Sequence, residues 1–558
     1  MKKIYSILAI VTTVMCTGLT SCSDVFDDLS TNPNQQGVNG FYTTPDNINK
    51  GIIGIYSYIS TPRAMGVSGL GIMFNKGDEG SSFSDYTEPG QYSSNITSSY
   101  YTIVQPYSLF YTAASQACQM IEVTPNVEFG NVKLKNAYLG EAYFLRAFAH
   151  FWLFTNFRNI PMMSALPKSA KDYKPQATPE EMWDFIIADL KKAKELLPEK
   201  TYWGANNAGR ATKGAAAALL GKAYLYRSGI EPIYGSSKKT YYSEAAAEFN
   251  EVIRGDYGKY ILNDDYNWNF DVKHENSDES VFEIQFMGDA VNTVFNPGLA
   301  TSGVWRDPRG FQPPWKGSKF SQVMHNWVYD TFVNSKDANG KTDYRMFGTL
   351  VFDDSAPEIS PKEGERVKVF DGKTYQEYYG TKGFGQFGVP ALNNYKSACR
   401  KSLDWTLPTT DPGTKMYMGN LRAFGLNYPY IRYADVLLMY AESVVMGGKQ
   451  GDISALDAVN MVRSRKSVSL PKLASVDMTS IEKERVLELT GEGHRGYDLL
   501  RWGKLSARFK ELTSTDPYFK KYSQGTYQGF KENKDEWLPI PQEEVDGNPY
   551  ITMNNPGW

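Results

Sequence analysis

The residues best suited to chemistry gather in a charged block that runs from Tyr428 to Lys504. Its cations and carboxylates fall at helical spacings beside apolar residues, so they share helices with a buried stripe. They are Arg432, Asp435, Glu442, Arg485, Glu488 and Glu492. Paired carboxylates can hydrolyse glycosidic bonds, but charges in a buried ladder must also be paired with one another. We therefore favour a structural charge network over catalysis, with Arg485 pairing to Glu488 or Glu492.

A second pattern combines aromatic rings with polar groups between positions 305 and 315. A sugar ring packs its C–H face on an aromatic plane, while its hydroxyls need planar donors and acceptors. Trp305, Arg306, Arg309 and Trp315 supply both kinds of group in a stretch that prolines stiffen, and a stiff loop loses less freedom on binding. We predict that these four residues bind ligand. The alternative is that the two indoles fill a small core within their own segment.

Further candidates lie nearer the N-terminus, in and after the Gly-rich stretch from Thr61 to Gln91. We interpret this stretch as a mobile loop, in which Asp78 contacts ligand or caps a turn. Its glycines do not form a dinucleotide fingerprint, because no strand precedes them and no helix clearly follows. Tyr86, Tyr100 and Tyr101 are the next aromatic candidates for ligand binding.

Several kinds of chemistry lack their motifs in this chain. The four histidines form no His-Glu-x-x-His pair, and no cysteines stand at zinc spacing. There is no Walker phosphate loop and no Gly-x-Ser-x-Gly elbow. We therefore expect no catalytic residue, no metal and no cofactor. Cys118 and Cys399 either pair with each other or remain buried thiols.

The N-terminus carries the pattern of a lipoprotein signal. Lys2 and Lys3 precede an apolar run, and small residues then lead into Cys22. A membrane-spanning helix needs about 20 apolar residues, and this run is shorter. We predict a signal peptide over residues 1–21, lipidation of Cys22 and a polar tether over 22–40. With 59 basic and 62 acidic residues, no positive surplus favours a nucleic-acid partner.

Secondary-structure elements must position these candidate residues. The clearest of these elements in the sequence is an internal helical repeat. The pattern Leu-Gly-x-x-Tyr begins at Leu139 and again at Leu220, and each copy precedes a second helix. This is tetratricopeptide spacing, in which a small residue lets paired helices approach closely. Thr178 and Glu181 predict a capping box at the start of one second helix. A third, weaker copy runs from Leu438 to Val462.

The middle of the chain differs from both ends in amino-acid composition. A short strand is predicted over Ser280–Phe286, after which Gly, Pro, Trp and Asn dominate to about Tyr428, with one helix over Phe320–Val333. A structureless loop of that length is unusual unless it is functional, so we expect a layer packed on the helices. Beyond it, Thr479 and Glu482 predict the capping box of another helix.

Three blocks in this order carry a resemblance to a known family: Glu141–Pro161, Tyr428–Lys504 and Trp537–Pro549. With the lipoprotein signal, they make the chain similar to the SusD/RagB family of outer-membrane nutrient-binding lipoproteins. The resemblance implies a mostly α fold, a tetratricopeptide-like helical scaffold with a loop-rich, irregular ligand-binding insert that carries short strands. It places a single domain at 41–558, with the scaffold at about 41–260 and 428–558 and the insert at about 261–427.

The resemblance also implies a function. The protein is expected to be no enzyme but a cell-surface, lipid-anchored protein of the outer membrane. It would capture an oligosaccharide or polysaccharide and deliver it to a TonB-dependent, SusC-like transporter. Two alternatives remain open: capture of a peptide or another nutrient by the same architecture, and glycoside hydrolysis. The identity of the glycan and the presence of a structural calcium ion are also open.

Overall fold

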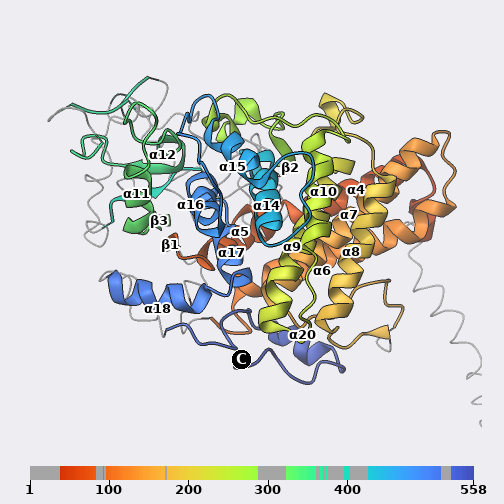
Figure 1. The fold of residues 1–558 in the computed structure, drawn as a ribbon. Coiled ribbons are helices and arrows are strands. Elements are labelled where there is room, and N and C mark those ends of the chain that lie inside the picture. Colours follow the sequence, from red (N-terminus) through yellow and green to blue (C-terminus); the bar gives the residue numbers. More distant parts are fainter. Residues whose placement is uncertain are drawn as a thin grey trace, which may run out of the picture.

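The computed structural model describes residues 38–82, 92, 96–169, 172–286, 322–359, 365–368, 372–374, 377, 395–401, 425–516 and 529–558. It is mostly helical with a few short strands, as Figure 1 shows, so the predicted fold class is confirmed. The predicted signal peptide and most of the tether lie outside the described residues. Within the described part, no helix is both long and apolar enough to cross a membrane.

The helical scaffold is a stack in which each long helix packs on the next. Its helices are α4 (Pro45–Ile59), α6 (Tyr101–Val123), α7 (Val132–Phe157), α8 (Pro179–Leu196), α9 (Lys213–Tyr234), α10 (Tyr242–Arg254), α14 (Tyr433–Val445), α15 (Ala455–Arg463) and α16 (Met478–Leu489). α7, α8, α9 and α10 pack in chain order, and α14 then packs on α10. α10 and α14 are therefore neighbours in the stack although residues 255–432 separate them in the chain (Figure 1).

Shorter elements surround this stack. The α-helices are α3 (Val38–Phe41), α5 (Ser68–Asn75), α11 (Asn326–Val333), α12 (Arg345–Thr349), α17 (Arg495–Arg501), α18 (Leu505–Thr515) and α20 (Gln542–Gly547). A π-helical turn, η1, covers Pro62–Gly66, and 3-10 turns cover Thr124–Asn126, Ala205–Asn207, Tyr266–Phe270 and Val272–His274.

Two glycines at equivalent positions explain the close pairing of the repeat helices. A Cβ on Gly140 of α7 would lie 2.9 Å from the backbone nitrogen of Leu197, and one on Gly221 of α9 would lie 2.7 Å from the ring of Phe249. Neither distance leaves room for a side chain, so glycine sets the spacing of α7 with α8 and of α9 with α10. The predicted tetratricopeptide-like pairs are confirmed.

Two predicted helix starts have different outcomes. The capping box of α8 forms, since Thr178 Oγ1 accepts from Glu181 N at 3.3 Å and Glu181 Oε2 accepts from Thr178 N at 2.8 Å. The prediction for α16 is wrong, because its N-cap is Asp477, whose carboxylate accepts from Ser480 N at 2.8 Å. Thr479 already lies inside the first turn.

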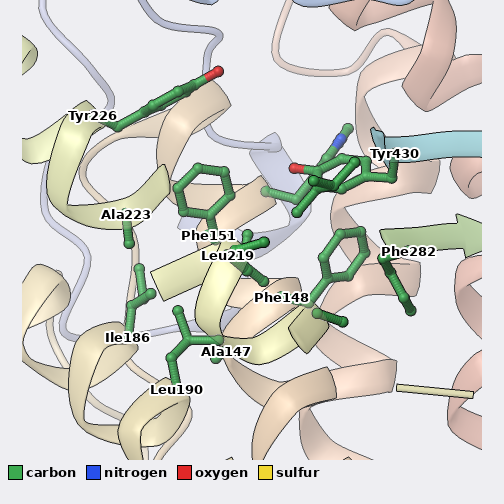
Figure 2. Packing of buried hydrophobic residues seen from close by; sticks show 14 of the residues in the cluster. Ala147, Phe148, Phe151, Ile186, Leu190, Leu219, Ala223, Tyr226, Phe282 and Tyr430 are labelled. Atoms are coloured by element: carbon green, nitrogen blue, oxygen red, sulfur yellow. The ribbon is translucent and has the colours of Figure 1, made fainter. Parts of the chain in front are cut away.

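The main core joins the repeat helices to a two-stranded antiparallel sheet of β2 (Ser280–Ile284) and β6 (Tyr428–Arg432). Phe148 of α7 meets Phe282 of β2 edge-on at 5.7 Å and Tyr430 of β6 at 4.8 Å between ring centroids. Figure 2 shows these rings together, with Ile186 and Leu190 nearby. One apolar cluster thus holds both strands against α7 and its neighbours.

A smaller sheet lies beside the stack and has its own core. Its strands are β1 (Gly80–Ser82), β3 (Gln322–Met324), β4 (Leu350–Phe352) and β5 (Ser397–Cys399), all antiparallel in the order β1-β3-β5-β4. Phe74 of α5 and Leu487 of α16 belong to the same apolar cluster as these strands. The sheet is therefore packed on the helices rather than separate from them.

Two predictions about the smaller elements are wrong. The stretch interpreted as a mobile loop contains α5, which is buried along its whole length. A Cβ on Gly69 would lie 2.6 Å from Ala64 O, so this glycine serves close packing rather than mobility. The helix predicted from Phe320 begins only at Asn326, after β3. Cys118 and Cys399 do not pair with each other, and both are buried thiols.

Candidate functional site

The predicted ligand residues divide into those that the structure describes and those that it does not. Outside the described residues lie Tyr86, Trp305, Arg306, Arg309 and Trp315, together with the predicted lipidation site Cys22. Tyr100 and Tyr101 stand at the start of α6 with ring centroids 5.2 Å apart, and Tyr101 is 40% exposed. Asp78 lies between α5 and β1.

Asp78 is buried in an ion pair instead of facing solvent. Arg495 Nε of α17 donates to one carboxylate oxygen at 2.7 Å, and Arg508 Nε of α18 donates to the other at 2.7 Å. Burial raises the pKa of this carboxyl, but the two guanidinium groups outweigh it and hold the pKa below its ordinary value. In this structure Asp78 fixes the start of β1 to the C-terminal helices.

The backbone of Asp78 organises a second set of contacts. Its carbonyl oxygen lies 2.8 Å from His325 Nδ1 and accepts from Trp327 Nε1 at 2.8 Å. His325 Nε2 lies 2.8 Å from Ser81 Oγ, and burial lowers the pKa of the imidazole. Sequence reasoning missed His325 and Trp327, because no spacing relates either one to position 78.

These contacts bring together the ends of two segments that contain predicted ligand residues. Ser82 is the last described residue before the stretch 83–91, and it pairs in the sheet with Gln322, the first described residue after 287–321. Asn326 Oδ1 also accepts from Lys396 N at 2.9 Å, just after the stretch 378–394. The segments that contain Tyr86 and Trp315 are therefore attached to adjacent strands of one sheet.

The charged residues of the C-terminal block form a buried network centred on Glu488. One carboxylate oxygen of Glu488 accepts from Arg432 Nη1 at 2.9 Å and from Arg465 Nη2 at 2.8 Å. The other oxygen accepts from Arg345 Nη1 at 3.0 Å. Burial raises the pKa of Glu488, but the guanidinium groups, led by Arg465, bring it well below the ordinary range.

Arg432 extends this network to two more carboxylates. Its Nε donates to Glu492 at 2.8 Å, and its Nη1 donates to Glu279 at 2.7 Å. Lys401 Nζ donates to Glu492 at 2.6 Å. The network thus links α16 and β6 to segments that precede β2 and follow β5. Sequence reasoning missed Glu279 and Lys401, which stand far from the charged block in the chain.

Arg485 does not pair with Glu488 or Glu492, so that part of the prediction is wrong. Its guanidinium group binds Asp498 at 2.7 Å and Asp435 at 2.9 Å. Although residues three apart are neighbours on a helix surface, the guanidinium group turns toward α14 and α17, which carry Asp435 and Asp498. Glu442 binds Arg501 and accepts from Trp502 Nε1 at 2.8 Å.

These arrangements bear on what the site can do chemically. Glu488 is held ionised by its cations, which is unsuitable for donating a proton near neutral pH. Burial raises the pKa of Glu79 to about 8, and its carboxylate accepts from Gly491 N at 3.2 Å. Among the residues that the structure describes, no three His, Cys, Asp or Glu side chains gather as a metal site.

The fold and this site define a class of protein in which a stack of paired helices supports a small sheet, and residues far apart in the chain meet in that sheet. Two family models match the chain: one described as the SusD family covers residues 278–558, and one described as starch-binding associating with outer membrane covers residues 31–225. The chain belongs to the SusD family.

Relatives and solved structures agree with this assignment. SusD-like protein P2 of Formosa agariphila is 26% identical over 441 residues, which span 76% of this chain and 74% of that protein. A SusD superfamily protein from Bacteroides vulgatus is 23% identical, with a TM-score of 0.70 over 93% of this chain and 100% of its own. Surface glycan-binding protein A from Bacteroides thetaiotaomicron, solved in complex with laminarihexaose, is 19% identical, with a TM-score of 0.66 over 92% of this chain and 100% of its own.

Proposed function

We propose that this protein is a surface glycan-binding lipoprotein that captures an oligosaccharide and delivers it to a TonB-dependent, SusC-like transporter. Membership of the SusD family carries the proposal. The protein is held at the outer membrane through lipidated Cys22, and it binds its ligand without turning it over.

The sheet of β1, β3, β4 and β5 supports this proposal from the structure. Adjacent strands β1 and β3 hold the ends of segments that contain Tyr86 and Trp315. Buried bonds from Asp78 to Arg495 and Arg508 fix the sheet edge to the helices. Ligand contacts that are held in place before binding lose less conformational freedom when the ligand arrives, which favours affinity. The stacking residues Trp305 and Trp315 and the polar residues Arg306 and Arg309 are our proposed ligand contacts.

Binding and turnover are tested together with the full chain and a panel of oligosaccharides that includes laminarihexaose. Calorimetry measures the affinity, and chromatography of the same samples measures cleavage. We expect binding of at least one oligosaccharide with no cleavage product. Cleavage would instead support a glycoside hydrolase, and binding of peptides alone would support the other alternative.

The two indoles are tested by the variants Trp305→Ala and Trp315→Ala. Loss of a stacking ring should weaken oligosaccharide binding by roughly 1 to 3 kcal/mol, by analogy with bases stacked on aromatic side chains. The unfolding temperature should stay nearly unchanged, whereas loss of a core tryptophan costs about 3 to 5 kcal/mol of stability. Tyr202→Ala is the control, because Tyr202 is 40% exposed on the loop between α8 and α9. If both tryptophan variants bind normally or both unfold early, these residues are not ligand contacts.

A further inference from the structure

A cavity of about 550 Å³ lies between the segment that follows α7 and the helix α20, which are far apart in the chain. Its apolar lining includes Tyr111, Met162, Met163, Leu166 and Tyr173. The volume falls within the range of pockets that hold small organic ligands, and such pockets are mostly apolar with a few polar groups. α20 lies at a different edge of the molecule from β1 and β3 (Figure 1).

One wall of this cavity is fixed by side chains of the scaffold. Tyr111 of α6 donates to Pro161 O at 2.7 Å, and Arg146 of α7 donates to Ser164 O at 2.8 Å. Met163 N donates to His150 Nε2 at 3.0 Å. These bonds hold the backbone on both sides of the two lining methionines. The cavity is therefore formed before any ligand enters, which lowers the cost of binding.

The opposite wall carries a half-buried carboxylate on α20. Glu544 lines the cavity, and within the described residues the hydrogen bond to its carboxylate is a long contact from Asn548 Nδ2 at 3.4 Å. Among these residues, burial and the bond from Asn548 are the influences on the Glu544 carboxyl, and no cation acts on it. Burial raises the pKa of Glu544, which shows that its negative charge is poorly compensated.

The charged side chains across the cavity do not supply that compensation. Lys168 and Lys174 are exposed, so water screens their charges. Asp172 is engaged in its own turn, where its carboxylate accepts from Lys168 N at 2.9 Å and Ser169 N at 2.8 Å. Glu544 is thus the charged group of this lining that gains most from a cation in the cavity.

Tyrosine rings beside a carboxylate suit one kind of ligand. An ammonium group is attracted to the faces of aromatic rings and to a carboxylate, while its alkyl or aryl body packs on methionine and leucine. We propose that this cavity binds an amphipathic organic cation, with the ammonium group at Glu544 and the apolar body against Met162, Met163 and Tyr173. The proposal uses none of the proposed glycan contacts Trp305, Arg306, Arg309 and Trp315, so it does not depend on them.

The test compares ligands of one shape and different charge on the full chain. Tryptamine is a cation, tryptophol is its neutral analogue and indole-3-propionate is an anion. Calorimetry at pH 7 should show tryptamine binding at least about tenfold more tightly than tryptophol, because a bond to a charged group is worth more than one to a neutral group. The anion should bind more weakly than both. Acetyl-Leu-Lys-amide, a second arm, shows whether a peptide lysine is accepted as well as a free amine.

Two variants and one control make the test specific. Glu544→Gln keeps the shape and removes the charge, so it should abolish the preference for tryptamine over tryptophol. Ala165→Phe places a ring in the cavity and should weaken binding of both. Glu195→Gln removes an exposed charge from α8 and should change neither affinity.

Laminarihexaose binding, measured on the same preparations, should be unaltered in Glu544→Gln, so failure here is distinguishable from failure of the glycan proposal. The inference is overturned if tryptamine and acetyl-Leu-Lys-amide both fail to bind, if tryptamine and tryptophol bind equally, or if a folded Glu544→Gln protein keeps the preference.

Discussion

Several buried guanidinium groups in the C-terminal third of this protein are held by more than one carboxylate, among them those of Arg432, Arg465 and Arg485. Arg432 is 1% exposed and binds Glu279, Glu488 and Glu492. Removing a charge from water costs several kcal/mol of free energy. Attraction to the partner charges offsets this cost only while all the partners are in place. A change at one residue therefore matters chiefly through the charges that it leaves behind.

Arg485→Ala tests this reasoning at one residue. The variant removes the guanidinium group that Asp435 and Asp498 share, which leaves Asp435 with Lys222 and Asp498 with Arg501. Each buried carboxylate then has one cation fewer, so we expect unfolding to become easier by about 3 kcal/mol or more. Chemical denaturation measures the loss. Lys192→Ala is the control, because its partner Glu195 is exposed and such pairs contribute about 0 to 1 kcal/mol. Equal stability of the two variants would contradict the buried placement of Arg485.

Glu79→Gln tests the unusual pKa of a buried carboxyl. The pKa of Glu79 is raised from 4.5 to about 8 in the folded protein, so folding favours its protonated form. Its contribution to stability is complete below pH 4.5 and is lost as the pH rises toward 8. The loss can reach roughly 1.4 kcal/mol for each unit of pKa shift. The glutamine variant does not ionise and should not lose this contribution.

The measurement is the difference in unfolding free energy between Glu79→Gln and the parent at several pH values. We expect this difference to move in favour of the variant between pH 5 and pH 8, while other titrating groups cancel because both proteins contain them. The same comparison with Glu195→Gln should be flat, since Glu195 is exposed. A flat profile for Glu79→Gln would show that this carboxyl ionises as easily as one in water.

At the scale of elements, helix pairs set by glycine form the framework on which the small sheet is built. α7 with α8 and α9 with α10 each meet at a glycine that has no room for a side chain. α14 then continues the stack after a long excursion of the chain. The spacing of one pair affects the next, because each helix contacts neighbours on both sides.

Gly140→Ala and Gly54→Ala form a matched pair that tests this account. Both glycines lie inside helices, where alanine is ordinarily better by about 1 kcal/mol. A Cβ at Gly54 of α4 meets nothing within 4 Å, so that variant should be stabilised. At Gly140 the Cβ lies 2.9 Å from Leu197 N, so α7 and α8 must separate and the variant should lose stability. The unfolding temperatures of both variants test this account. Stabilisation of both variants would contradict a close approach of α7 and α8 at Gly140.

The elements also show what the sequence can and cannot predict. The repeat helices, the capping of α8 and strand β2 have local periodic signals, and they were predictable. The strands of the small sheet are only three residues long, too short to show alternation. Arg345 binds Glu488 across 143 residues and Glu279 binds Arg465 across 186, so no spacing identifies these pairs. The stretch around α5 was wrongly interpreted as a mobile loop, because its glycines indicate close packing here rather than mobility.

The residue types suited to the candidate site could be predicted from the sequence, but their contacts in the fold could not. Asp78 was a candidate ligand contact, yet the structure gives its carboxylate to Arg495 and Arg508. Trp305 and Trp315 lie outside the described residues, so their role stays a prediction. Burial of a carboxyl depends on which distant helices cover it, and sequence composition does not contain that information.

For the whole molecule, we propose that Cys22 is the point of attachment to the membrane. Cys22→Ser removes the acceptor of lipid and leaves the folded body intact, so the protein should leave the membrane fraction with its unfolding temperature unchanged. Cys118→Ser is the control and should stay with the membranes, because Cys118 is a buried thiol of the body. Retention of the Cys22→Ser protein in membranes would overturn the lipoprotein interpretation.

The pairing of Asp78 with Arg495 spans 417 residues of chain. A ribosome makes the first partner long before the second, so the sheet edge at β1 lacks its anchor until synthesis is nearly complete. The same delay applies to Arg345, whose carboxylate partner Glu488 comes 143 residues later. Shortened chains that end before α16 leave Asp78 without Arg495 and Arg508, and they leave Arg345 with Asp343 but without Glu484 and Glu488. Such chains should be degraded as incomplete products rather than accumulate as partly working proteins.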